Sequence, residues 1–568
     1  MTTRLAGLLM LAIVCAAQDA PEIESREAKP NFSTGVNLVV IPVIVRDRDG
    51  KAIGNLTRDD FQLFEKGKPQ FISRFSIEKT GEKAAADAKK LEELSKSAGA
   101  GEDVAPSHFI AYVFDDLRMD AGEIAAMRGT AWKHIDGTMK SADRVAIYTT
   151  SGIGMLDFTD DHDQIEGALR KLQPRPRLHG GTECPDVSFL MADEIINHDN
   201  QPVLALATTD AIKCQNLIDA TLPGVPGSSG SSGQVQGQAA ARSAAARVLA
   251  MGESEVQQTF TVLKDIVTRM ATSPGQRSVV VISPGIFLTE IYRNYESDLL
   301  DRALRSNVTI STLNTHGLYV PDQLDIDRGA TARSATARLS YTQQEAQAGD
   351  DVLTELAEGT GGTYFHNNND AAEGLRVTAA TPEYIYLLGF SPQNLKYDGK
   401  FHSVKVALKA ANYNLQARRG YYAPKQAPNE EEQAQEEIKQ WMYSREDAQE
   451  FPIGLKTQFF KPAPDSARIT VFGEVDLKGV QFAKADGRNR DTISIVAGIF
   501  DRNGNILKAG GRAIDLKFRD ETLAAHLAQG LALKLSFDVA PGKYLVRLVV
   551  RSSEGQMMSA RNTIVEVP

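Results

Sequence analysis

Two apolar runs, His108–Phe114 (HFIAYVF) and Arg277–Ser283 (RSVVVIS), decide the fold of this chain. Nearly continuous apolar runs are typical of strands that are buried on both faces of a sheet. Apolar residues also recur at helical spacing from Ile124 to Met139, and Val145–Thr149 and Val308–Leu313 have strand character. This alternation of strands and helices predicts a mostly parallel sheet with helices on both faces.

Strand-rich segments flank this α/β block. Residues 36–79 contain β-branched runs and a hairpin signal at Asp49-Gly50, and strands return over residues 381–424. We expect the two segments to pack as one composite β-domain, with Pro42 favouring an edge strand. Residues 425–450 predict an acidic helical linker. Hairpin turns at regular spacing over residues 451–568 predict a seven-stranded, immunoglobulin-like β-sandwich.

The α/β block, residues 107–380, contains an insertion at about 184–256 that is too long for a simple crossover. It has helix-like stretches around Val187–Asn197 and Val203–Ala220, then a Gly/Ser/Pro-rich segment that indicates a flexible loop. An Ala-rich helix follows and merges with Val256–Met270. We expect residues 325–349 to form a second irregular stretch. The polar residues 18–34 are expected to be disordered.

The N-terminus indicates export. Arg4 precedes an apolar run from Leu5 to Ala17, and its ~13 residues are fewer than the ~20 needed to cross a bilayer. Residues 1–17 therefore predict a secretory signal peptide that is cut before Gln18, with a buried N-terminal helix as the alternative. No other run reaches membrane-spanning length. We expect secretion across the inner membrane to a periplasmic or extracellular location, with association with the cell envelope left open.

Removal of residues 1–17 would leave Cys184 and Cys214 as the cysteines of the mature chain. In an oxidising compartment this pair is expected to form a disulfide. Closing a loop of ~30 residues would stabilise the fold by roughly 3–4 kcal/mol. Two free buried thiols are the alternative.

Composition and motifs exclude several function classes. The 568 residues carry a net charge of −10, which argues against broad nucleic-acid binding because that needs a basic face. Three cysteines without a C-x-x-C pair argue against zinc ribbons and iron–sulfur clusters. No G-x-S-x-G elbow, H-E-x-x-H pair or P-loop is present. His162 lies in an acidic cluster, but at a helix start where aspartates are expected as caps. We predict no catalytic residues.

The order and spacing of several motifs from Val36 to Pro424 resemble the VWFA-related acidobacterial domain family, whose core is a von Willebrand factor A (VWA) domain. The motifs are VRDRDGKAIGNLTRDDFQLFEKGKPQFISRF, FIAYVFDDLRM, HGGTECPDVSFLMADEII, SVVVISPG, LAEGTGGTYF, YLLGFSP and ARRGYYAP. The resemblance implies a doubly wound, mostly parallel, Rossmann-like VWA domain flanked by a β-domain.

The resemblance also implies where a Mg²⁺ site would lie. Such domains hold the ion with Asp-x-Ser-x-Ser on a first loop, a threonine on a second and an aspartate on a third, because Mg²⁺ requires hard oxygen ligands. Here Asp115 is followed by Leu117 and Met119 at the hydroxyl positions, and Pro284 replaces the third-loop aspartate. A register shifted by one would use Asp116, Arg118 and Asp120.

The site is therefore degenerate, and Asp115, Asp116 and Thr182 are its remaining candidate ligands. Mg²⁺ at these residues is one expectation. The alternative is that Asp115 caps the following segment while Asp116 and Arg118 are solvated or paired. We expect no other cofactor.

A positively charged partner-binding face is predicted beside this site, formed by Arg118, Arg175, Arg177 and His179. The alternative is that these arginines are solvated in exposed loops. The sequence as a whole predicts a secreted, non-enzymatic, adhesion-type module that binds a protein partner and not nucleic acid. A structural or assembly protein of the cell envelope and an unrecognised hydrolase are the alternatives. The partner's identity and the oligomeric state are not predicted.

Overall fold

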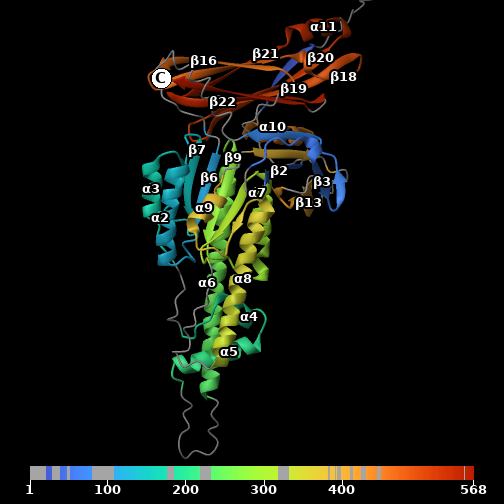
Figure 1. The fold of residues 1–568 in the computed structure, drawn as a ribbon. Helices are drawn as coiled ribbons and strands as arrows, with labels where there is room; N and C mark the ends of the chain where they lie inside the picture. Colours follow the sequence, from blue (N-terminus) through green and yellow to red (C-terminus); the bar gives the residue numbers. More distant parts are fainter. Residues whose placement is uncertain are drawn as a thin grey trace, which may run out of the picture.

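The computed structural model describes residues 21–28, 39–47, 52–79, 106, 108–175, 184–217, 232–317, 332–380, 384–390, 392, 398, 400–409, 413–423, 430–443, 450–554 and 557–568. The predicted signal peptide lies outside these residues, as do Thr182, Arg177 and His179. The chain forms an α/β domain with a long helical insertion, a composite β-domain beside it, and a C-terminal β-domain above both (Figure 1).

The α/β domain is built on a six-stranded sheet in the order β11-β10-β9-β6-β7-β8. All neighbouring strands are parallel except β8, which runs antiparallel to β7. Every residue of β6 and β7 is buried, as the apolar runs predict. The strands are β6 (His108–Phe114), β7 (Asp143–Thr149), β8 (Leu156–Thr159), β9 (Gln276–Ser283), β10 (Thr309–Asn314) and β11 (Tyr364–Phe365).

Helices cover both faces of this sheet, so the predicted α/β architecture is confirmed. Alternate residues of β6 enter opposite cores because successive strand side chains point to opposite faces. One core packs against α2 (Ala121–Thr138), α3 (His162–Arg170) and α9 (Ala371–Thr378). The other packs against α6 (Ser232–Met270), α7 (Arg293–Arg305) and α8 (Ala332–Thr360).

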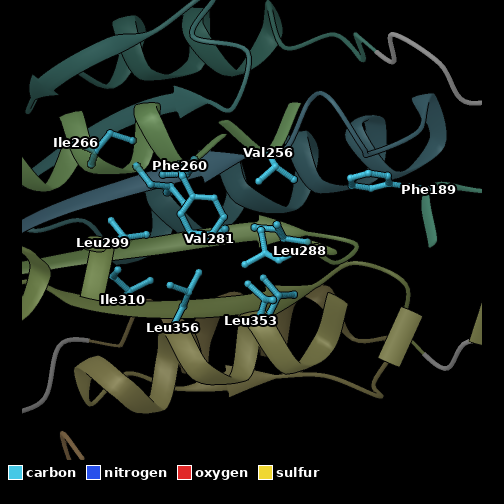
Figure 2. Packing of buried hydrophobic residues seen from close by; sticks show 14 of the residues in the cluster. Phe189, Val256, Phe260, Ile266, Val281, Leu288, Leu299, Ile310, Leu353 and Leu356 are labelled. Atoms are coloured by element: carbon cyan, nitrogen blue, oxygen red, sulfur yellow. The ribbon is translucent and has the colours of Figure 1, made fainter. Parts of the chain in front are cut away.

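Figure 2 shows how the second core joins the insertion to the sheet. Phe260 of α6, Val281 of β9 and Leu356 of α8 point toward one another across the helix–sheet interface. Phe189 of α4 (Phe189–Ile196) belongs to the same buried cluster. The insertion therefore shares the hydrophobic core of the domain.

The insertion is helical and extends below the sheet (Figure 1). It contains α4, α5 (Gln201–Cys214) and the first part of α6, which continues without a break for 39 residues. The predicted disulfide is confirmed: Cys184 and Cys214 are bonded, with their Cα atoms 5.8 Å apart.

The prediction of an irregular stretch over residues 325–349 was wrong for its described part, because α8 runs from Ala332 to Thr360. The first turns of α8 have few large apolar residues, and contacts with the insertion hold them in place. Arg338 pairs with Asp210 of α5 at 2.8 Å, and the Leu190 amide of α4 donates to Glu345 at 3.2 Å. These partners lie far away in sequence, so the local pattern did not reveal the helix.

The composite β-domain joins strands from both ends of the α/β block. One sheet has the order β14-β2-β12-β5 and the other β15-β13-β3-β4, and their inner faces share one core. The first sheet contains β2 (Val39–Arg46), β5 (Arg74–Lys79), β12 (Tyr384–Phe390) and β14 (Asn414–Ala417). The second contains β3 (Phe61–Glu65), β4 (Lys68–Gln70), β13 (Phe401–Leu408) and β15 (Gly420–Tyr422). A 3₁₀ turn, η1 (Arg58–Asp60), precedes β3.

Strand β2 is not the edge strand that Pro42 predicts, because it pairs with β12 on one side and β14 on the other. The pairing with β14 covers only Val43–Arg46. Pro42 lies just outside it, so a central strand accommodates the missing amide hydrogen.

The C-terminal domain is a two-sheet sandwich around one core. The described part of 451–568 contains eight strands, one more than predicted, in sheets of order β16-β17-β21 and β1-β20-β19-β22-β23 with β18 paired to β19. The strands are β16 (Ile453–Ala463), β17 (Ser466–Val475), β18 (Ala483–Ala485), β19 (Arg488–Phe500), β20 (Ile506–Phe518), β21 (Leu531–Val539), β22 (Gly542–Ser552) and β23 (Met558–Val567). Helix α11 (Asp520–Gln529) and the 3₁₀ turn η4 (Leu477–Gly479) complete it.

The edge strand of this sandwich comes from the other end of the chain. Residues 18–34 are not entirely irregular, because β1 (Ile23–Ala28) pairs antiparallel with β20 over six residues. Glu22 anchors the strand by accepting hydrogen bonds from Thr522 and the Arg519 amide, and it lies 3.0 Å from His526. The acidic helix α10 (Glu430–Tyr443) packs on the same sheet through Ile438, Met442 and Tyr443.

The turn between β19 and β20 docks on the amino ends of β6 and β7. Arg144 Nε donates to the Arg502 carbonyl at 3.0 Å. A Cβ on Gly504, whose φ is +78°, would lie 2.3 Å from the ring of Phe109. Only glycine combines this backbone conformation with this close approach. The opposite, carboxyl ends of the strands face the insertion.

Among the described residues, no helix is both long and apolar enough to cross a membrane.

Candidate functional site

The candidate site lies at the topological switch point of the six-stranded sheet. β6 is first in the chain, β7 lies on one side of it and β9 on the other, so the connections leave in opposite directions. Open α/β sheets bind ligands in the crevice at such a point, beyond the carboxyl ends of the strands. Here Asp115 and Asp116 follow β6, Thr150 and Ser151 follow β7, and Ser283 ends β9.

Asp115 is completely buried and its carboxylate is saturated by protein donors. Its Oδ1 accepts from Thr150 Oγ1 at 2.8 Å, and its Oδ2 accepts from Ser283 Oγ at 2.6 Å. Nη1 of Arg118 lies 3.2 Å from Oδ1 and 3.1 Å from Oδ2. The backbone is fixed as well, because the Asp115 amide donates to the Ile282 carbonyl of β9 at 2.9 Å.

Asp116 is 1% exposed and bonds mainly to the loop after β7. Its Oδ1 accepts from the Ser151 amide at 2.8 Å, and its Oδ2 accepts from Ser151 Oγ at 2.6 Å. Burial is the main cause that raises the pKa of Asp116, and the neighbouring Asp115 charge adds to it. Hydrogen bonds from Ser151 and Thr150 oppose the rise.

Each aspartate has its own arginine. The Arg118 side chain is 13% exposed and also donates from Nη1 to Thr259 Oγ1 of α6 at 3.0 Å. Arg175 is 42% exposed, with Nε 3.6 Å from Asp116 Oδ2 and its amide donating to the Asp116 carbonyl at 2.6 Å. Two carboxylates and two guanidinium groups therefore balance, with one cation enclosed and one accessible.

The described residues do not fit a Mg²⁺ site. Leu117 and Met119 stand where hydroxyl ligands are required, and both are buried. Asp120, needed by the shifted register, caps α2: its carboxylate accepts from the Glu123 amide at 2.7 Å. Both oxygens of Asp115 already accept two bonds each, and no group of three or more His, Cys, Asp or Glu side chains suited to a metal occurs among the described residues.

The structure thus places Asp115, Asp116, Arg118 and Arg175 of the predicted site residues together. Thr182, Arg177 and His179 lie outside the described residues. Thr150, Ser151, Ser283 and Thr259 also line the site but were not predicted from the sequence. Three of these follow or end buried strands, which is the signal that could have found them. Thr259 lies within a helix 141 residues from its partner Arg118, where no local signal exists. His162 is elsewhere, on α3, with Nδ1 3.0 Å from Asp136.

No family model and no curated protein sequence matches this chain. Among solved structures, it is similar to the conserved hypothetical protein BatB from Bacteroides thetaiotaomicron, with 12% identity and a TM-score of 0.21 over 48% of this chain and 96% of that one. It is also similar to three N-terminal domains of the type V pili tip protein Mfa5 from Porphyromonas gingivalis, with 9% identity and a TM-score of 0.21 over 95% of this chain and 78% of that one. A β-glucuronidase from Bacteroides uniformis aligns at 13% identity and a TM-score of 0.14, over 34% of this chain and 20% of that one. At these values the likeness assigns neither a family nor an activity.

Proposed function

We propose that this chain is a secreted, non-enzymatic protein-binding module with a VWA-like domain, and that the partner binds at the carboxyl-end face of the six-stranded sheet. The motifs shared with the VWFA-related family support the domain type. The sheet order supports the location, because the switch point is where open α/β sheets bind ligands.

The observation that carries this proposal is the arrangement of charge at the switch point. The carboxylate oxygens of Asp115 and Asp116 already accept hydrogen bonds from hydroxyl, amide and guanidinium donors inside the protein. Arg175 is held at the same place through its backbone, yet 42% of its side chain is exposed. The face therefore presents a positioned cation on a rigid base, an arrangement suited to recognising an acidic partner surface rather than to transferring protons.

The test is affinity capture from the envelope and culture fluid of the producing cells, using residues 18–568 as bait. Wild type is compared with Arg175→Glu and with the matched control Arg490→Glu. Arg490 is 41% exposed and pairs with Asp486 in the C-terminal domain. We expect one partner to be retained by wild type and the control and lost by Arg175→Glu, with or without EDTA. Retention by all three proteins would place binding elsewhere.

Export is also part of the proposal. The Cys184–Cys214 disulfide supports it, because such bonds persist in oxidising compartments. N-terminal sequencing of the protein from producing cells should begin at Gln18. A protein that retains residues 1–17 and stays in the cytoplasm would contradict this. Turnover of any member of a chromogenic hydrolase-substrate panel would contradict the non-enzymatic assignment.

A further inference from the structure

The surroundings of one nitrogen atom, Nη1 of Arg118, carry an inference about the switch point. This nitrogen lies 3.1 and 3.2 Å from the two carboxylate oxygens of Asp115 and 3.0 Å from the hydroxyl oxygen of Thr259. Carboxylate and other hard oxygens are the ligands that divalent cations such as Mg²⁺ prefer. A cationic nitrogen at hydrogen-bond distance thus sits among oxygens of the kind that would otherwise hold a metal ion.

We propose that the guanidinium of Arg118 takes the place of a divalent cation at the switch point, so that the site is charge-compensated without metal. A buried carboxylate needs such compensation, because removing a charge from water is costly unless it is paired and hydrogen-bonded. This proposal does not depend on whether a partner binds the face.

The residues beside Arg118 support its position. Leu117 and Met119 are 1% and 0% exposed, and they anchor the chain on both sides of the arginine. The amides of Arg118 and Met119 both donate to the Asp115 carbonyl, at 3.2 and 2.9 Å. Leu117 and Met119 therefore have two effects. They leave no hydroxyl ligands for a metal ion at these positions, and they hold Arg118 over Asp115.

Arg118 also links this loop to the insertion. Its partner Thr259 lies on α6, and the same helix continues to Ser232 beside α4 and α5, in the insertion that the Cys184–Cys214 disulfide closes. A bound metal ion could be removed by a chelator, whereas a side chain cannot. The proposal therefore implies that the geometry of the switch point and its link to α6 are insensitive to divalent cations.

The experiment measures thermal unfolding of residues 18–568 in EDTA and with Mg²⁺ or Mn²⁺ added. Four proteins are compared with wild type: Arg118→Gln, Arg118→Lys, the double variant Asp115→Asn/Arg118→Gln, and Arg128→Gln. Arg128 is the control, because it lies on α2 and donates to the Arg170 carbonyl without an acidic partner among the described contacts.

We expect wild type and Arg128→Gln to unfold at the same temperature with and without cations. Arg118→Gln should unfold roughly 10 °C lower in EDTA, because it leaves Asp115 buried without a counter-charge. Mn²⁺ or Mg²⁺ should restore about 5 °C of that loss at a hundred times the dissociation constant. Arg118→Lys keeps the charge and should show no cation response. The double variant removes both charges and should be more stable than Arg118→Gln, again without a response.

Three results would overturn the proposal. The first is a Mg²⁺- or Mn²⁺-dependent stabilisation of wild type that the double variant lacks. The second is an Arg118→Gln variant as stable as wild type. The third is a destabilised Arg118→Gln variant that does not respond to either cation. Should Arg118→Gln not fold at all, the double variant decides: a folded product supports charge compensation by Arg118, and an unfolded one refutes it.

Discussion

The two ends of the six-stranded sheet both contain buried charges that are paired within the α/β domain, but only at the amino end does a buried charge also bond to the C-terminal domain. At the amino end, Arg144 is 3% exposed, pairs with Asp160 at 3.0 Å and donates to the Arg502 carbonyl of the C-terminal domain. His108 and Asp143 pair there at 2.7 Å. At the carboxyl end, Asp115 is compensated by Arg118, three residues further along the same loop.

This difference distinguishes an assembly contact from a candidate functional face. The amino end is covered by the β19–β20 turn, so its charges help to hold two domains of one chain together. At the carboxyl end, Arg175 remains 42% exposed. Buried charge by itself therefore does not mark a site; an exposed charged side chain beside the buried charges does.

The largest effect is expected from removing the charge of Asp115. Asp115→Asn leaves Arg118 enclosed without its counter-ion and should lower the free energy of unfolding by about 3–5 kcal/mol. Urea unfolding can be followed by the fluorescence of Trp132 in a Trp441→Phe background. The control is Asp298→Asn, whose side chain is 57% exposed and pairs with Lys264, and which should lose under about 1 kcal/mol. Equal losses would remove the distinction between the site and an ordinary surface pair.

The opposite end can be disturbed at Gly504. Gly504→Ala places a Cβ 2.3 Å from the Phe109 ring at a positive φ, and should cost roughly 2–3 kcal/mol and loosen the C-terminal domain. Gly487→Ala is the matched control: its φ is +71°, but the space around it is open. It should cost about 1 kcal/mol. Limited proteolysis should release the C-terminal domain only from Gly504→Ala, and a similar result for both variants would contradict the tight docking.

Glu296 of α7 sharpens the comparison, since it is a buried carboxylate that faces another carboxylate. Burial and then the charge of Glu355 raise its pKa from 4.5 to about 8. The folded state binds this proton more tightly than the unfolded state, so stability should fall as pH rises from about 4.5 to 8 and then level off. Glu296→Gln should remove this decline, so the variant should be more stable than wild type above pH 8. Parallel stability–pH curves for the two proteins would refute the raised pKa.

The smallest effect is expected at the rim of the amino end. Arg502 pairs with Asp160 at 2.9 Å, but its side chain is 63% exposed. Arg502→Ala should cost about 0.2–1 kcal/mol in urea unfolding, because solvent screens exposed pairs. Arg144 keeps its bond to the residue-502 carbonyl in this variant. A loss above about 2 kcal/mol would mean that this side chain, rather than the main chain, holds the domains together.

Much of the fold followed from local patterns. The runs at residues 108–114 and 277–283 predicted strands buried on both faces, and helical spacing predicted the helices between them. The missed elements have weak local signals. β1 (IESREA) is short and polar, and it is a strand because the edge of β20 supplies its hydrogen bonds. The first turns of α8 are held by α4 and α5.

The candidate site divides in the same way. Its location was predictable, because Asp115 and Asp116 directly follow a buried strand and parallel strands bring their carboxyl ends to one edge. Its chemistry was not. From the sequence, Asp115 and Asp116 could either bind a metal ion or be paired or solvated. The choice between these two interpretations depends on which side chains reach Asp115.

The sequence by itself determined the parallel α/β core, the position of the switch point and the cysteines available for a disulfide, because burial and periodicity are encoded by neighbouring residues. Only the tertiary structure decided how the charges are compensated. Asp115 meets Ser283 from 168 residues away, and Arg118 meets Thr259 from 141 residues away. Such partners are brought together by packing of the whole sheet and its helices, and that packing places a guanidinium at the switch point.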